Sequence, residues 1–382
     1  MKEITVFTVG DSRKVSTWSG VPYFLTAHLE KNGIRVNRVD ISPNKYFGWI
    51  YKQTVLRILK LWHPDTEFDY FRSFTNYVLT TLKILLLQIR YASADRDLLL
   101  TYSFPILCRK RKSCMLSDWT FEQYIKNQLA RKLYVEEKIC VYFERRNLNK
   151  VHLVVSLFPQ SAQQLSEIIG KQVVHLGSNV VNICYNKPIT PSIVDKKWGK
   201  KNILFIGRPA YAKGANTLLK AFTKIVNDMP EAEFHIVGFD SNTLGAENAI
   251  VKNVHFHGYL RKEKEEDRNL YYELMTQATL FVNPSQKWGG YSSIIEAMYF
   301  YTPVIVAPFN EFVNEFGEVL TFGDYVETDS ENRLYELLRL NLTGSFDKYT
   351  AKALNAHKAV EGHTWDNFVK SLINEMDKHS NI

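Results

Sequence analysis

The feature that most constrains the fold is an alternation of short apolar segments with amphipathic segments along the first half of the chain. The apolar segments include ITVFTVG, RVNRVDIS, DLLLTYS and VHLVVSLF, and the amphipathic ones include VPYFLTAHLEKNG and SAQQLSEIIG. Ser161 is the expected cap of SAQQLSEIIG, and a long helical run is expected over residues 121–147. Because strands that alternate with helices pair side by side in parallel, this pattern predicts a parallel sheet with helices on both faces. The fold class is therefore α/β.

The alternation stops once and then resumes. Residues 186–201, NKPITPSIVDKKWGKK, combine two prolines with a cluster of lysines, which is typical of a linker. Beyond them NILFIG, AEFHIVG, TLFVNPS and TPVIVAP are expected strands. A chain of 382 residues suits two domains. We predict two Rossmann-like, doubly wound domains at residues 1–190 and 198–362, followed by a final amphipathic helix at about residues 363–382.

The charge balance favours an anionic partner. The net charge is +8 and the isoelectric point is about 9.0, which suits a nucleotide, a phosphorylated lipid, a membrane surface or nucleic acid. A mildly basic enzyme with no such partner fits the charge equally well. The lysines are scattered rather than interleaved with aromatic residues on one surface, so a nucleic-acid-binding protein is disfavoured.

Cysteine usage and the apolar segments suggest a cytoplasmic location. The four cysteines form no CxxC pair and no tight cluster with histidine, so we expect a reducing compartment and no structural zinc. The N-terminal stretch MKEITVFTVGDS lacks the pattern of a signal peptide. The longest apolar stretch, residues 77–89, is shorter than a transmembrane helix and contains Lys83.

The clearest local motif is GRPAYAKGANTLLKAF, in which an expected strand ends at Gly207 and an expected helix follows Gly214. Arg208 and Lys213 flank the short loop between them. Two cations beside the free N–H groups and the dipole of a helix N-terminus form an anion site. The alternative is that both side chains are ordinary solvated loop charges.

A second motif, NPSQKWGGYSSIIEAM, follows the expected strand TLFV. Gly289 and Gly290 would let the backbone approach a ligand closely, and Ser292 or Ser293 could cap the following helix. The carboxylate of Glu296 could accept paired hydrogen bonds from a diol such as the ribose of a nucleotide. The alternative is an ordinary surface glutamate.

A third candidate lies in the loop STWSG after the first strand. Ser19 and Gly20 precede an expected helix, so this loop is a second candidate contact for a phosphate or an acceptor.

The order of these motifs resembles glycosyltransferase family 4, whose members have the GT-B fold. The resemblance is carried by GR-x4-KG, FVNPS, the glycine-containing loop and IIEAM-x4-TPVIVA, together with STWSG, LSDWTFEQY and HLGSNV nearer the N-terminus. It covers nearly the whole chain. It implies an N-terminal acceptor-binding domain, completed by the final helix at about residues 363–382, and a C-terminal donor-binding domain. It also implies the transfer of a sugar from a nucleotide-sugar donor with retention of configuration.

The resemblance also implies roles for individual residues. Arg208 and Lys213 would hold the donor diphosphate and act in catalysis, and Glu296 would hold the ribose. The expected donor-binding residues are Gly207, Arg208, Lys213, Trp288, Gly289, Gly290, Tyr291, Ser292 and Glu296.

The chain departs from the family at two positions. Trp288 stands where the Glu-x7-Glu motif has its first glutamate, which leaves the transferred sugar undefined. Residues 101–106, TYSFPI, lack the histidine that many relatives carry, so no catalytic histidine is assigned. Fixed cations can still stabilise the charge on a departing phosphate, and in the front-face mechanism attributed to the family that phosphate takes the acceptor proton.

No metal or other cofactor is expected. Asp95 and Asp97 match an Asp-x-Asp metal motif, but they precede a strand instead of ending one, and we interpret them as a turn. His255 and His257 alternate on one strand face without a third ligand, so we interpret them as structural.

One stretch of the N-terminal half suggests a membrane surface or a lipid-diphosphate acceptor. The basic run Arg109–Lys112 accompanies Trp49, Trp62 and the apolar segments LRILKLW and YVLTTLKILLLQIR. The alternative is a solvated charge run over ordinary core helices.

The sequence therefore predicts a retaining, metal-independent glycosyltransferase that uses a nucleoside diphosphate sugar and a glycan, lipid-linked or other hydroxyl acceptor. Cell-surface polysaccharide or lipopolysaccharide biosynthesis is the expected pathway, with peripheral attachment to the inner face of the plasma membrane left open. The alternatives are a transferase for small molecules or natural products, a nucleotide-sugar epimerase, and an inactive binding subunit suggested by Trp288. A phosphorylase would need a pyridoxal-binding lysine and a much longer chain.

Overall fold

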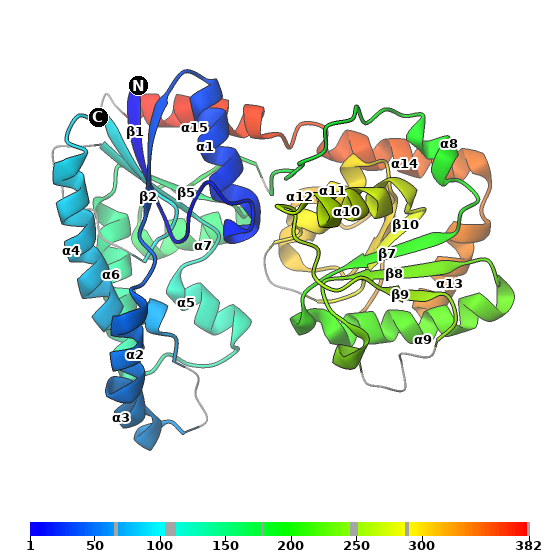
Figure 1. The fold of residues 1–382 in the computed structure, drawn as a ribbon, viewed down its shortest axis with the longest axis horizontal. Helices are drawn as coiled ribbons and strands as arrows, with labels where there is room; N and C mark the ends of the chain where they lie inside the picture. Colours follow the sequence, from blue (N-terminus) through cyan, green and yellow to red (C-terminus); the bar gives the residue numbers. More distant parts are fainter. Residues whose placement is uncertain (65–67, 104–111, 178, 245–250, 287–289, 380–382) are drawn as a thin grey trace. The chain divides into compact units, whose positions relative to one another are not determined.

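The computed structural model describes residues 1–64, 68–103, 112–177, 179–244, 251–286 and 290–379 (Figure 1). These residues form two compact units. Unit 1 comprises residues 1–178 and 365–382, and unit 2 comprises residues 179–364. Each unit contains one parallel six-stranded sheet flanked by helices, which confirms the predicted α/β class.

Unit 1 has the strand order β2-β1-β3-β4-β5-β6, with every pair parallel. Its strands are β1 (Glu3–Thr8), β2 (Arg35–Asp40), β3 (Arg96–Leu99), β4 (Lys112–Ser117), β5 (Leu153–Ser156) and β6 (Val174–His175). Its helices are α1 (Val21–Lys31), α2 (Lys45–Gln53), α3 (Val55–Trp62), α4 (Phe74–Arg90), α5 (Phe121–Gln123), α6 (Val135–Lys150), α7 (Pro159–Ile169) and α15 (Trp365–Lys378). Short turns of helix, η1 (Thr17–Gly20), η2 (Tyr70–Arg72) and η3 (Tyr124–Gln128), lie between them.

The sheet of unit 1 is buried on both faces. Every residue of β1 is buried, as expected for a central parallel strand covered by helices on each side. Residues of α4, α6 and α7 pack with the strands in one core cluster that includes Phe7, Leu99 and Val154. Helices α1 and α15 lie against each other, so the last helix of the chain belongs to the first unit.

Unit 2 has the strand order β12-β11-β10-β7-β8-β9, again parallel throughout. Its strands are β7 (Asn202–Ile206), β8 (Glu233–Val237), β9 (Val254–Phe256), β10 (Leu280–Asn283), β11 (Val304–Val306) and β12 (Gly323–Tyr325). Its helices are α8 (Ile193–Lys197), α9 (Ala212–Asp228), α10 (Glu265–Gln277), α11 (Ser292–Tyr299), α12 (Asn310–Phe316), α13 (Glu331–Thr343) and α14 (Phe346–Val360). The turns η4 (Pro209–Tyr211) and η5 (Ser241–Leu244) complete the unit.

Figure 1 shows α9 and α13 on one face of this sheet, and α10, α11, α12 and α14 on the other. The core beneath α9 contains Phe205, Phe222 and Phe234 together with Leu334 of α13. The order of the strands reverses between β7 and β10. Ligands of open α/β sheets bind at the carboxyl ends of the strands beside such a reversal.

The structure differs from the sequence expectations at several elements. Residues 112–117 form the central strand β4, which the sequence does not predict because its burial depends on pairing with β3 and β5. The helical run expected over residues 121–147 is divided, and Ala130 has a φ of +49° at the break. Ser161 does not cap α7, because the helix begins at Pro159 and Ser161 is buried within it.

The residues just before the expected linker, and part of the linker itself, pack into unit 2. Val181 N–H donates to His363 O at 2.9 Å, and Cys184 N–H donates to the Tyr272 hydroxyl at 2.6 Å. Residues 193–197 form α8, and the buried Lys197 Nζ donates to Phe300 O at 2.6 Å. Burial holds the pKa of Lys197 well below its usual range. These bonds place the division between the units near residue 179, whereas the sequence suggested residue 190.

None of the helices in the described part of the chain combines the length and the apolar character that crossing a membrane requires.

Candidate functional site

The reversal of strand order in unit 2 brings the two main sequence motifs together. Strand β7 leads into Gly207 and Arg208, then through η4 into α9. Strand β10 leads through residues 284–291 into α11. Because β7 and β10 are adjacent and parallel, their following loops leave the same edge of the sheet.

The two loops are in direct contact. Asn283 Nδ2 donates to Ile206 O at 3.3 Å, and a Cβ atom on Gly214 would lie 2.2 Å from Ser285 Oγ and 3.0 Å from its backbone nitrogen. Only glycine allows this approach. A Cβ on Gly238, whose φ is +115°, would lie 1.8 Å from Gly207 O. Gly214 therefore lets α9 pack closely on the loop after β10, and Gly238 lets the end of β8 pack closely on the residue before Arg208.

Arg208 and Lys213 both present exposed side chains beside the start of α9. Lys213 is the second residue of the helix, and its Nζ lies 3.0 Å from both carboxylate oxygens of Asp329. Both partners of this ion pair are more than 70% exposed, and such pairs contribute only about 0.2–1 kcal/mol. Helix α9 has no side-chain cap and no acidic residue in its first turn, so its first amides and both cations favour an anion.

Glu296 is not the ordinary surface glutamate that the sequence left as the alternative. It lies in the second turn of α11, and its side chain is 3% exposed. Lys262 Nζ donates to both carboxylate oxygens at 2.7 and 2.9 Å. Tyr271 and Tyr272 hydroxyls donate at 2.7 and 3.3 Å. A diol can therefore reach this carboxylate only by displacing one of these donors.

The residues around Glu296 were missed by sequence reasoning. Lys262 lies in the charged run RKEKEE, and Tyr271 and Tyr272 lie in the amphipathic helix α10. Nothing local in either segment points to a carboxylate partner. Burial first, and then the charge of Glu296, raises the pKa of both tyrosines, and Lys262 Nζ lies 4.2 Å from the ring centre of Tyr271.

The rest of the predicted donor loop is placed only in part. Trp288 and Gly289 lie outside the described residues. Tyr291 is buried, with its ring 5.3 Å from that of Phe312, and it contributes to the core of unit 2. Ser292 is the first residue of α11 and its hydroxyl bonds to Asn179 Oδ1 at 3.2 Å, so neither it nor Ser293 caps the helix.

Gly290 has space for a side chain. The nearest atom to a Cβ built on it is Asn179 Oδ1, at 3.7 Å. The structure of the described loop therefore gives no steric reason for glycine at this position.

Ser19 and Gly20 follow β1 in unit 1, beside the reversal of strand order between β1 and β3. Trp18 and Ser19 have φ values of +42° and +55°, and Gly20 has a φ of +88°. Such a conformation costs about 1–3 kcal/mol for each non-glycine residue. The candidate loop is thus locally strained at the start of α1.

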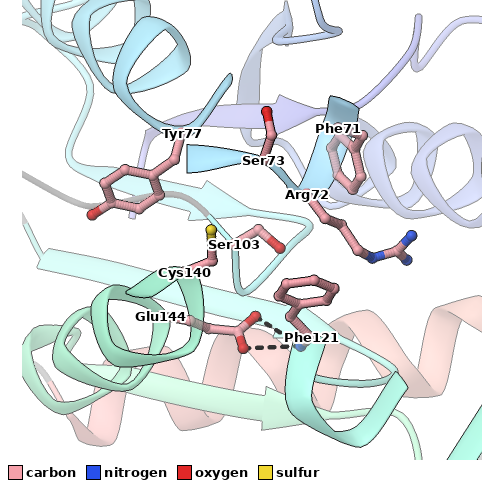
Figure 2. Close-up of a pocket in the computed structure, with 8 residues that line it drawn as sticks. All are labelled: Phe71, Arg72, Ser73, Tyr77, Ser103, Phe121, Cys140 and Glu144. Atoms are coloured by element: carbon pink, nitrogen blue, oxygen red, sulfur yellow. Dashed lines mark hydrogen bonds between the residues drawn. The ribbon is translucent and has the colours of Figure 1, made fainter. Parts of the chain in front are cut away.

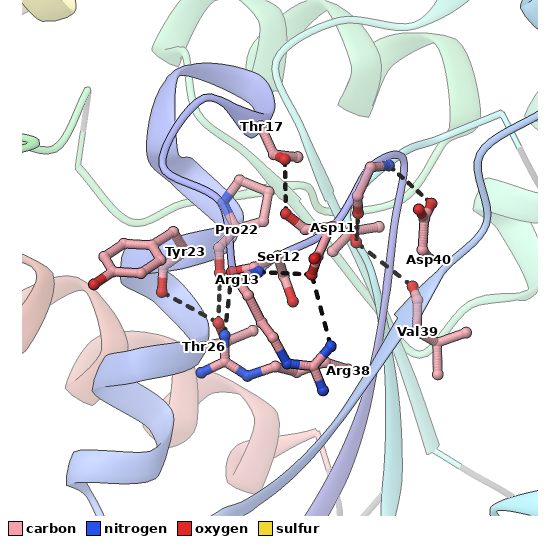
Figure 3. A network of polar contacts seen from close by, with 12 residues as sticks. Asp11, Ser12, Arg13, Thr17, Pro22, Tyr23, Thr26, Arg38, Val39 and Asp40 are labelled. Carbon is pink, nitrogen blue, oxygen red and sulfur yellow. Dashed lines mark hydrogen bonds and ion pairs between the residues drawn. The ribbon is translucent and has the colours of Figure 1, made fainter. Parts of the chain in front are cut away.

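Polar bonds hold the first part of this loop against β2 (Figure 3). Gly10 N–H donates to Asp40 Oδ1 at 3.0 Å, Thr17 Oγ1 donates to Asp11 O at 2.7 Å, and Arg38 Nη1 donates to Ser12 O at 3.1 Å. Burial raises the pKa of Asp40, but the bonds from Ser42 and Gly10 outweigh it and lower the pKa overall. These bonds fix the position from which the strained turn begins.

Unit 1 also contains a cavity that sequence reasoning did not find. Figure 2 shows Arg72, Ser103, Cys140 and Glu144 facing it. Both carboxylate oxygens of Glu144 accept the Phe121 N–H, at 2.9 and 3.1 Å, so Glu144 caps the start of α5. Burial raises the pKa of Glu144 to about 8. A neighbouring cavity of about 100 Å³ shares Arg72 and Cys140 and extends under α3.

The acidic pair considered as a metal motif is structural. Asp95 Oδ2 accepts the backbone N–H groups of Lys2 and Glu3 at 2.6 and 3.0 Å, and the buried Asp97 accepts Gln88 Nε2 at 2.8 Å. The described residues contain no group of three or more metal-ligating side chains suited to an ion. Of the basic run, Arg109 to Arg111 lie outside the described residues, and Lys112 begins β4.

A third histidine joins the pair predicted on β9. His235 Nδ1 lies 3.1 Å from His257 Nε2, and its ring stacks on that of His255 with centres 4.8 Å apart. Burial, followed by the neighbouring imidazoles, lowers the pKa of His235 to about 4. Strand β8 supplies His235, so the cluster depends on strand pairing that the sequence does not show.

Comparison with known proteins identifies unit 2 most directly. Residues 200–338 match the family model for glycosyl transferases group 1. No curated protein matches the sequence. Among solved structures, sucrose-phosphate synthase from Thermosynechococcus elongatus is similar over 99% of both chains, with a TM-score of 0.70 and 15% identity.

Two further structures are similar over the full length. The α,α-trehalose 6-phosphate synthase from Burkholderia multivorans has a TM-score of 0.68 and 10% identity over 100% of this chain and 99% of its own. HepE from Anabaena has a TM-score of 0.63 and 13% identity over 99% of this chain and 100% of its own.

The family match spans β7 to α13, which include both loops at the strand reversal. The similar structures extend over both units and confirm the predicted GT-B fold. Unit 2 therefore contains a glycosyl transferases group 1 domain, and the chain is a glycosyltransferase with the GT-B fold.

Proposed function

We propose that the chain transfers a sugar from a nucleoside diphosphate sugar to a hydroxyl acceptor with retention of configuration, as members of glycosyltransferase family 4 do. One observation carries the proposal. Arg208 and Lys213 stand at the uncapped start of α9, beside the strand reversal and in contact with the loop that follows β10. This is an arrangement suited to a diphosphate.

UDP is the first donor nucleotide to test. HepE was solved with UDP and glucose, and the pneumococcal O-GlcNAc transferase GtfA with UDP and GlcNAc. The sugar itself stays open, because Trp288 replaces the glutamate expected to contact it.

The proposed reaction needs no residue to act as a base. The bond between the sugar C1 and the β-phosphate oxygen breaks, and its electron pair leaves with the nucleoside diphosphate. The acceptor hydroxyl oxygen bonds to C1 on the same face, and its proton passes to the departing phosphate oxygen. Arg208, Lys213 and the amides of α9 stabilise the charge on that phosphate, and we propose that no metal is required.

Glu296 would contribute to donor binding through its neighbours. The carboxylate fixes Lys262 and the two tyrosine hydroxyls, and a ribose would exchange with one of these donors. The acceptor is proposed to be a glycan or a lipid-linked sugar of a cell-surface polysaccharide or lipopolysaccharide made in the cytoplasm. Transfer to a small molecule, epimerisation and an inactive donor-binding subunit are the alternatives.

The test is a binding panel of UDP, GDP, ADP, CMP and dTDP by thermal shift and calorimetry, each with EDTA and with Mg²⁺. Variants Arg208→Ala and Lys213→Ala remove one cation each. Lys220→Ala is the matched control, since Lys220 is exposed on the same helix, about two turns beyond Lys213. We expect one diphosphate to stabilise the wild type in EDTA, with a loss of about tenfold or more in affinity in each site variant.

Two outcomes would reject the proposal. Binding of no nucleotide would remove the donor assignment. Equal weakening by Lys220→Ala would show that the cations act only through overall charge. Detection of the free nucleoside diphosphate on incubation with the matching sugar donor and acceptor, by coupled assay, separates a transferase from an inactive subunit.

A further inference from the structure

Helix α3 does not bury its apolar side chains. It has no buried residue, and Ile58, Leu61 and Trp62 are 61%, 79% and 80% exposed. The spacing places these three on one side of the helix, while Arg57 and Lys60 fall on the other. A surface helix normally turns its apolar stripe toward the core. The stripe of α3 therefore lacks a covering element within the described residues.

The exposed apolar surface continues onto two neighbouring helices. On α4 the exposed residues Phe74, Val78, Leu82, Leu86 and Ile89 recur every three or four positions, and so form one stripe. On α6 the corresponding residues are Val135, Ile139 and Tyr142.

These helices lie together. The cavity of about 100 Å³ is lined by Val55 of α3, Phe74 of α4 and Cys140 of α6, and Figure 1 shows α2, α3, α4 and α6 along one side of unit 1. We call the exposed apolar residues of α2, α3 and α4 the helical face; those of α2 are Tyr46, Phe47 and Trp49.

The charged residues of the three helices that carry this face have one sign. Helices α2, α3 and α4 contain no aspartate or glutamate, and their six cations are all exposed: Lys45, Lys52, Arg57, Lys60, Lys83 and Arg90. On the neighbouring helix α6, Glu137 pairs with Arg131 and Glu144 is buried, while Glu136 is half-buried and lines the cavity.

The chemistry selects one partner. A second copy docked on the same face would bring like charges together without acidic partners. Nucleic acid would match the cations but leave the aliphatic and tryptophan side chains in water. A bilayer surface accommodates both, because apolar side chains and tryptophan enter the interface while lysine and arginine meet anionic headgroups. We propose that the helical face binds the surface of a membrane that contains anionic lipid.

This proposal is independent of the donor chemistry. The helical face belongs to unit 1, whereas Arg208 and Lys213 belong to unit 2. The face includes Trp49, Trp62 and the two apolar segments that the sequence suggested for such a contact, and it forms without the basic run Arg109–Lys112, most of which lies outside the described residues. If the acceptor is lipid-linked, the face would bring unit 1 to the surface where that acceptor lies.

The test is cosedimentation of the full chain with vesicles of phosphatidylcholine alone, and of phosphatidylcholine mixed with phosphatidylglycerol. The wild type should bind the anionic vesicles and bind pure phosphatidylcholine much more weakly. The triple variant Ile58→Ser, Leu61→Ser, Trp62→Ser should bind at least about tenfold more weakly. The pair Lys52→Glu, Lys60→Glu should lose about fivefold or more for each charge and should respond to salt.

Leu340→Ser with Lys358→Glu is the matched control, because both residues are exposed on helices of unit 2. It should bind the vesicles as the wild type does. The UDP-dependent thermal shift, measured on every variant, should be unchanged. That readout tests the donor site of unit 2 alone, so it separates failure of this proposal from failure of the donor site. Slow hydrogen exchange across β1 to β6 in every variant shows that unit 1 stays folded.

Three results would overturn the proposal. Equal binding to both vesicle types would show that the cations of α2, α3 and α4 do not contribute to membrane binding. Wild-type binding by the triple serine variant would move the contact to another surface. A dimer in light scattering that the triple variant abolishes, with no vesicle binding, would assign the face to a second copy of the chain.

Discussion

The bonds around Glu296 give the clearest case of a functional candidate whose setting is decided by residues distant in sequence. Its carboxylate is buried and held by Lys262 from another loop and by two tyrosines from α10. A buried ion pair of this kind adds little net stability, but the loss of one partner is costly because the other charge stays buried.

Replacing Lys262 with methionine should therefore destabilise the protein strongly. The expected loss in the free energy of unfolding is about 3–5 kcal/mol, measured by urea denaturation at neutral pH. The matched variant Lys213→Met breaks an exposed pair and should cost at most about 1 kcal/mol. Adding Glu296→Gln to Lys262→Met should restore much of the loss, since it removes the uncompensated charge. A mild effect of Lys262→Met alone would mean that the tyrosine hydroxyls suffice for Glu296.

The histidines of β8 and β9 should make the stability of the protein depend on pH. Burial lowers the pKa of His235 to about 4 and also lowers that of His257, whereas an unfolded histidine titrates near 6.5. Below about pH 6.5 the unfolded chain binds more protons than the folded one. The free energy of unfolding should therefore fall as pH decreases from about 6.5 to about 4.

The measurement is urea denaturation across this range for the wild type and for His235→Asn, which should show a shallower decline. Glu144 changes stability in the opposite sense, because its raised pKa favours the folded state at low pH. The contribution of His235 is therefore the difference in the free energy of unfolding between the wild type and His235→Asn at each pH. Glu233→Gln serves as the control: it removes the neighbour that raises the pKa of His235 and should not reduce the pH dependence. Parallel curves for the wild type and His235→Asn would contradict the account.

At the scale of elements, the sequence predicts the helices and strands whose formation depends on the local pattern of residues. The β7–α9 unit is anticipated because an apolar strand, two glycines and an amphipathic helix follow one another. Strand β4 is missed because its burial depends on β3 and β5, its neighbours in the sheet. The helix expected over residues 121–147 is divided because Ala130 adopts a positive φ, which alanine gives no reason to expect.

The packing of α9 on the loop after β10 should depend on Gly214. Alanine would place a Cβ 2.2 Å from Ser285 Oγ and 3.0 Å from its backbone nitrogen. Such crowding costs about 1–3 kcal/mol, partly offset by about 0.5–1 kcal/mol from the better helix former. We expect Gly214→Ala to lower the melting temperature and to weaken nucleotide binding, measured together by thermal shift.

Gly362→Ala is the control for that experiment, since a Cβ there meets no atom within 4 Å. Combining Gly214→Ala with Ser285→Gly should recover part of the stability by removing the nearest atom. If Gly214→Ala binds the nucleotide as the wild type does, the close approach of the two loops is not what positions the proposed anion site.

At the scale of the molecule, the chain returns to its first unit at its end. Helix α15 buries Trp365, Phe368, Val369, Leu372 and Met376 against unit 1. Its polar contacts also join it to unit 1: Lys31 Nζ lies 2.9 Å from Asp366, and Arg96 Nη2 lies 3.0 Å from Asp377. The sequence predicted this return from the resemblance to GT-B enzymes, and no local pattern in residues 365–378 identifies the unit they join.

Removal of α15 should therefore unfold unit 1 selectively. Burial of its five apolar side chains is worth on the order of 10 kcal/mol as an upper estimate, comparable with the entire stability of a typical domain. In a chain shortened to residues 1–364, hydrogen exchange should become fast across β1 to β6 and stay slow in β7 to β12. The nucleotide-dependent stabilisation of unit 2 should persist. Lys370→Ala, at an exposed position of α15, should leave exchange unchanged. Slow exchange in unit 1 of the shortened chain would show that its sheet is stable without α15. The last helix would then connect the two units without being needed to complete the first one.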